Sequence, residues 1–86
     1  MGTKEKLISR FKRQPKDFTF NELVRLFKIY SFNLEHIGST SGSRVKFVNK
    51  EKDLQYRVHK PHPSNIIKHY VIKQVTEYLK INKFIK

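Results

Sequence analysis

The first third of the chain carries apolar residues at helical spacing. An apolar stripe among basic neighbours predicts a short amphipathic helix over about residues 4–13, ended by Pro15. The stretch TFNE at residues 19–22 has the form of a capping box, in which the Thr19 hydroxyl and the Glu22 carboxylate satisfy free amides at a helix start. The apolar face expected for this second helix consists of Phe20, Leu23, Val24, Phe27 and Tyr30.

The last third of the chain predicts a third helix, over about residues 67–81. Its expected apolar stripe consists of Ile67, Val71, Val75 and Tyr78. Lysines occupy other positions of this segment, so the helix presents a basic surface. Beyond it, Phe84 and Ile85 are expected to fold back onto the core.

Between these helices the apolar period changes to two, which is typical of half-buried strands. Apolar and polar residues alternate over residues 32–37, 44–48 and 54–60, with polar or glycine-containing turns between them. The third strand stops at Pro61, because proline has no amide to donate to a ladder.

The order of elements predicts an α+β domain over residues 1–86, with a three-stranded antiparallel sheet and helices on one face. Helices on one face leave the other face open. If the apolar strand residues point at the helices, strand pleating gathers basic and imidazole groups on the open face. These are Arg44, Lys46, Arg57 and His59.

The charge balance indicates a polyanionic partner. Nineteen Lys and Arg against seven Asp and Glu give a formal net charge of +12 over 86 residues. Neutralising phosphates releases condensed counterions, so nucleic acid is the first expectation, ahead of an acidic protein or an anionic membrane. A hydrophobic content of 37% supports one folded core rather than disorder.

The residue inventory excludes several chemistries. The chain has no cysteine, which excludes disulfides and thiolate catalysis, and HKPH at residues 59–62 has no nearby carboxylate to complete a metal site. No apolar run approaches the roughly 20 residues that cross a bilayer, and no signal segment precedes the first helix. We therefore expect a cytoplasmic protein with no cofactor, no metal and no membrane partner.

The element order, the stretch GSTSGSRVKF at residues 38–47, the strand end VHKPHP at 58–63 and the final basic helix resemble the HicA family of bacterial toxins. The resemblance implies a double-stranded-RNA-binding-domain-like fold with a core over about residues 19–81, to which the helix at 4–13 is an addition. It also implies an mRNA endoribonuclease, or mRNA interferase, of a type II toxin–antitoxin system. The implied partners are mRNA and a HicB-like antitoxin that covers the basic site of a toxin expected to be monomeric when free.

One position departs from the family pattern, which carries Gly-Ser-His before the second strand. Here Gly42 and Ser43 are followed by Arg44, which stabilises a developing charge but is a poor general base. The pattern also carries histidine just past the strand end, where His62 stands, and His59 shares the expected open face with Arg44. Because imidazole titrates near neutrality, the catalytic hypothesis assigns these two histidines as acid or base of metal-independent cleavage, with Arg44 as electrostatic stabiliser.

Further residues are expected to bind the RNA backbone. Small loop residues let a phosphate approach closely, and the start of the last helix favours an anion. The expected set is Ser41, Gly42, Ser43, Lys46, Arg57, Lys60, Lys68 and Lys73. Two alternatives remain open: a non-catalytic double-stranded RNA-binding module, favoured by Arg44 in place of histidine, and a DNA-binding module whose last helix enters the major groove.

Overall fold

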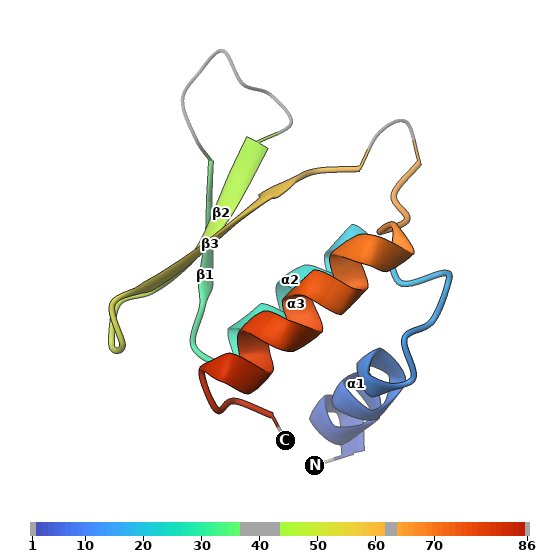
Figure 1. Cartoon of the computed structure of the whole chain (residues 1–86), viewed down its shortest axis with the longest axis horizontal. Coiled ribbons are helices and arrows are strands. Elements are labelled where there is room, and N and C mark those ends of the chain that lie inside the picture. Colours follow the sequence, from blue (N-terminus) through green and yellow to red (C-terminus); the bar gives the residue numbers. More distant parts are fainter. Residues whose placement is uncertain (1, 37–43, 62–63, 86) are drawn as a thin grey trace.

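The elements follow the predicted order of two helices, three strands and one helix, which confirms the α+β class (Figure 1). The computed structural model describes residues 2–36, 44–61 and 64–85. The elements are α1 (Gly2–Lys12), α2 (Phe20–Ile29), β1 (Asn33–His36), β2 (Arg44–Asn49), β3 (Leu54–His59) and α3 (His69–Ile81). No helix of the described residues is long and apolar enough to cross a membrane.

The predicted capping box fixes the start of α2. The Glu22 amide donates to the Thr19 hydroxyl oxygen at 3.2 Å, and the Thr19 amide donates to the Glu22 carboxylate at 3.0 Å. The residues on either side of Thr19 anchor the segment before α3, because the Phe20 amide donates to the Asn65 carbonyl and the Ile67 amide to the Phe18 carbonyl. Two stretches almost fifty residues apart in sequence are therefore joined by backbone hydrogen bonds.

The sheet has the strand order β1-β2-β3, with both neighbours antiparallel, so β1 and β3 are its edges. Leu34, Phe47 and Tyr56 stand opposite one another across the three strands. The helices lie on one side of the sheet (Figure 1), where Val45 and Phe47 are buried. We call the opposite side the outer face.

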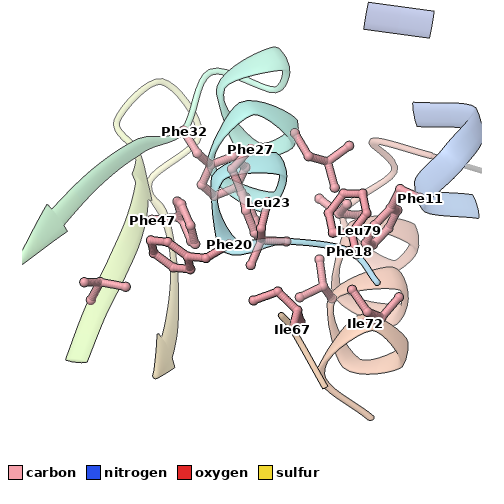
Figure 2. Close-up of a cluster of buried hydrophobic side chains, with 13 residues drawn as sticks. Phe11, Phe18, Phe20, Leu23, Phe27, Phe32, Phe47, Ile67, Ile72 and Leu79 are labelled. Carbon is pink, nitrogen blue, oxygen red and sulfur yellow. The ribbon is translucent and has the colours of Figure 1, made fainter. Parts of the chain in front are cut away.

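Aromatic packing joins the sheet to the helices. Phe27 of α2 stacks on Phe47 of β2 with ring centroids 4.1 Å apart, and it meets the Phe32 ring edge-on at 5.0 Å (Figure 2). On the other side of α2, Phe11 of α1 is fully buried, and its ring centroid lies 5.4 Å from that of Phe18. Helix α1 therefore completes the hydrophobic core.

Helix α3 differs from its prediction in start and orientation. It begins at His69 rather than residue 67, because the Ile67 amide donates to the Phe18 carbonyl and the N-cap residue Lys68 has an extended backbone. Its buried residues are Ile72, Val75, Thr76 and Leu79. Of the expected stripe, Val75 is buried in the helix and Ile67 is buried before it, whereas Val71 and Tyr78 are only partly buried against the core. Helix α1 likewise spans residues 2–12 rather than 4–13.

The segment after α3 folds back as expected. The Phe84 ring lies 5.3 Å from the Tyr30 ring and 5.5 Å from the Phe32 ring, measured between centroids. Ile85 also packs against the core.

Candidate nucleic-acid interface

The outer face collects the basic strand residues, as the alternation predicted. Arg44 of β2 stands directly opposite His59 of β3, and Lys46 stands opposite Arg57. Directly opposite residues of an antiparallel pair point to the same side of the sheet. Arg44, Arg57 and His59 are exposed, whereas their neighbours Val45 and Val58 point toward the helices.

We assign Arg44–His59 and Lys46–Arg57 as non-hydrogen-bonded pairs of the antiparallel ladder. The Tyr78 hydroxyl of α3 donates to the Gln55 carbonyl at 3.1 Å, so this carbonyl points to the free edge of β3 and not to β2. Along a strand, the amides and carbonyls of every second residue point to the same side. Those of Arg57 and His59 therefore point to the free edge of β3, as those of Gln55 do. Such non-hydrogen-bonded positions bring opposite Cα atoms to about 4.5 Å, which places an imidazole beside a guanidinium.

A neutral phenol maintains this arrangement. Burial raises the pKa of Tyr78 above its ordinary value of 10.0, so the hydroxyl keeps its proton at neutral pH and remains a donor to Gln55. Burial and the nearby Tyr78 also raise the pKa of Tyr56, whose ring lies 4.7 Å from that of Tyr78.

The net charge of the outer face is positive. Arg44, Lys46 and Arg57 share it with one carboxylate among the described residues, Glu35 of β1. Glu35 stands opposite Lys46, with 4.0 Å between its carboxylate oxygen and the Lys46 Nζ. At this distance and exposure the pair orients Lys46 and stabilises little. Sequence reasoning missed Glu35, although its place in the alternation of β1 puts it on this face.

Two further predicted phosphate ligands line a groove of about 640 Å³ between β3 and the start of α3, which Arg57 and His59 also border. Lys60 and Lys68 line this β3–α3 groove together with His69 and with Lys16, a residue the sequence analysis did not single out. The Lys60 Nζ lies 5.8 Å from the centroid of the Phe20 ring. The basic residues therefore extend from the outer face into this groove, with Arg57 and His59 common to both.

The remaining predicted residues are not brought into either group. Lys73 is exposed on α3 and is not among the described residues that line the groove. Ser41, Gly42, Ser43 and His62 lie outside the described residues. Over residues 2–36, 44–61 and 64–85, no three His, Asp or Glu side chains are grouped closely enough to hold a metal ion.

Comparison with known proteins adds no relative: no protein-family model, curated protein or solved structure matches the chain.

Proposed function

We propose that the protein binds RNA through its outer face and cleaves it without a metal ion, as the toxin of a HicA-type toxin–antitoxin pair. The observation that carries the proposal is the pairing of Arg44 with His59 and of Lys46 with Arg57 on the uncovered side of the sheet. The double-stranded-RNA-binding-like identity of the fold belongs to the same proposal.

The outer face suits a phosphate backbone. Arginine presents a planar fork of donors that matches two phosphate oxygens, and two such forks flank the patch at Arg44 and Arg57. The two cross-strand pairs are separated by two residues along each strand, or about 7 Å. A ribose-phosphate chain crossing the sheet therefore meets one cation after another.

His59 favours RNA over DNA as the substrate. In the proposed reaction its neutral imidazole takes the proton of the ribose 2′-hydroxyl, and the 2′-oxygen attacks the adjacent phosphorus. The bond from phosphorus to the 5′-oxygen breaks, the 5′-oxygen takes a proton from His62, and a 2′,3′-cyclic phosphate remains. Arg44 stabilises the charge that develops on the phosphorane.

A second function is favoured by Arg44 itself, which stands where the HicA pattern has histidine. A protein with the same basic face and no base in reach of the 2′-hydroxyl would bind RNA without cutting it. The two functions share the outer face and differ only in the role of His59.

A cleavage assay in EDTA tests the proposal. The wild-type protein should cut folded RNA and leave 2′,3′-cyclic or 3′-phosphate ends. His59→Ala should lower the rate by at least about a hundredfold, the lower end for loss of a general base or acid, with little change in affinity. The matched control is His69→Ala, which removes another exposed histidine, on α3, and should keep the wild-type rate.

The outcomes separate the two functions. RNA that is bound and stays intact would exclude the nuclease and retain the non-catalytic function. RNA that is neither bound nor cut would remove both.

A further inference from the structure

Strand β3 is an edge of the sheet formed by the described residues, so alternate backbone groups of this strand point away from β2. The Gln55 carbonyl at this edge accepts a hydrogen bond from the Tyr78 hydroxyl. By the parity of the strand, the amides and carbonyls of Arg57 and His59 point to the same edge, where no turn, loop or side-chain hydrogen bond of the described residues reaches them. Unpaired groups at a sheet edge are a template for another strand.

An apolar trough lies beside this edge. The β3–α3 groove is lined by Tyr56 and Val58 from the strand and by Ile66 and Tyr70 from the start of α3 and the segment before it. Ile66 is 37% exposed and Tyr70 is 59% exposed, and they are two of the three large apolar side chains exposed in the described residues. Apolar surface thus adjoins the free hydrogen-bonding groups of the same strand.

The groove has a basic rim. Lys16, Lys60 and Lys68 line it, and no Asp or Glu occurs among its described lining residues. An occupant with carboxylates gains attraction from this rim, and a basic occupant is repelled.

Strand geometry specifies the pattern of the occupant. In a strand added beside β3, residues opposite Arg57 and His59 point to the outer face, and their alternates, level with Tyr56 and Val58, point into the groove. The chemistry of the two sides therefore requires acidic residues at one set of positions and apolar residues at the other.

We propose that the β3 edge binds an extended acidic segment of a partner protein as an added strand, with its alternate apolar side chains in the groove. The inference stands apart from RNA cleavage, because it depends on the strand backbone and the groove. A protein segment fits this site better than RNA, since an apolar trough beside the open amides and carbonyls of a strand edge suits a polypeptide.

Occupation of the edge has a consequence for the outer face. The acidic side chains of the added strand would lie beside Arg57 and His59, which the proposed function uses for RNA. The partner would therefore exclude RNA without covering the whole face.

Fluorescence anisotropy with a labelled peptide of alternating Glu and Val tests the site. The peptide should bind the wild-type protein, and a peptide of the same composition with all Glu before all Val should bind at least about tenfold more weakly. N-methylation of one alternate set of peptide amides should abolish binding, and N-methylation of the other set should not, because only one set faces β3.

Substitutions in the protein provide a second readout. The double change Ile66→Ser and Tyr70→Ser should lower the affinity for the alternating peptide at least about tenfold, because it removes the apolar side chains that anchor the peptide. The matched control is Ile81→Ser, the third exposed apolar residue, which is 74% exposed and absent from the groove lining, and it should bind as the wild type does.

Any of three peptide results would overturn the inference. These are no binding of the alternating peptide, equal binding of the two peptide orders, and equal loss of binding whichever set of peptide amides is N-methylated. Loss of RNA affinity but not peptide affinity in the Ile66 and Tyr70 variant would assign the groove to RNA and would also overturn it. Register-dependent peptide binding by a protein that fails to bind RNA would uphold the inference and reject the proposed function.

Discussion

Arg44 and His59 stand directly opposite each other on neighbouring strands, both exposed, on the side of the sheet that the helices leave uncovered. Their meeting depends on the register of β2 and β3. A slip of one residue would turn either side chain toward the helices and remove the pair. The turn between the strands therefore controls the outer face.

Asn49, at the end of β2, is expected to stabilise this turn. Asn49 is 1% exposed. Its side-chain Nδ2 donates to the Tyr30 carbonyl at 2.9 Å, and its side-chain Oδ1 accepts from the Lys52 backbone amide at 3.0 Å. Asn49→Ala leaves both backbone groups without a partner and should lower the free energy of unfolding by about 1–3 kcal/mol. Urea denaturation measures this change in the free energy of unfolding. Asn33→Ala, at an exposed site, is the control, and equal losses would contradict a special role for Asn49.

Phe11→Ala should show that α1 is part of the folded core. Removing a fully buried phenylalanine side chain is expected to cost about 3–5 kcal/mol of unfolding free energy. Ser9→Ala, at an exposed position of the same helix, should change stability by less than about 0.5 kcal/mol. A loss below about 1 kcal/mol for Phe11→Ala would mean that α1 is peripheral.

The Arg10–Glu22 ion pair should make stability depend on acidic pH. The Arg10 Nε donates to Glu22 at 2.8 Å, and this hydrogen bond lowers the pKa of Glu22 below its ordinary value of 4.5, against an opposing effect of burial. A carboxyl with a lowered folded-state pKa stabilises the protein above its ordinary pKa, and this contribution disappears as pH falls through the folded value.

Glu22→Gln should therefore flatten the pH dependence of the urea midpoint between about pH 6 and about pH 3.5. Glu51→Gln in the exposed β2–β3 turn is the control and should retain the wild-type profile. A Glu22→Gln profile that coincides with the wild type would show that the pair contributes nothing to stability.

Alternation in the sequence was sufficient to predict that Arg44, Lys46, Arg57 and His59 share the outer face, because side-chain direction in a strand has a period of two. It was also sufficient for the start of α2, where the Thr19 and Glu22 contacts are local. Both features involve residues close in sequence or fixed by parity, so no tertiary information was needed.

The groove and the orientation of α3 depend on tertiary contacts. The segment before α3 is positioned by the backbone hydrogen bond from Ile67 to Phe18, which leaves no side-chain signal. Thr76 is buried although threonine is polar, because its hydroxyl donates to the Ile72 carbonyl at 2.8 Å and accepts from Gln14 at 3.3 Å. The hydrophobicity pattern therefore placed Val75 correctly but missed Ile72, Thr76 and Leu79. Val71 and Tyr78 of its stripe are only partly buried against the core.

A comparison of two variants with equal net charge tests the central claim most directly. One replaces Arg44, Lys46 and Arg57 of the outer face with Gln, and the other replaces the exposed helix residues Lys12, Lys28 and Lys80 with Gln. RNA affinity is measured for both over a range of salt concentrations.

The outer-face variant should bind RNA far more weakly, and the slope of log K against log salt should become shallower by about 2–3, as expected for three lost phosphate contacts. The helix variant should keep the wild-type slope and nearly the wild-type affinity. Equal losses in the two variants would show that only total charge matters and would contradict an RNA site on the outer face.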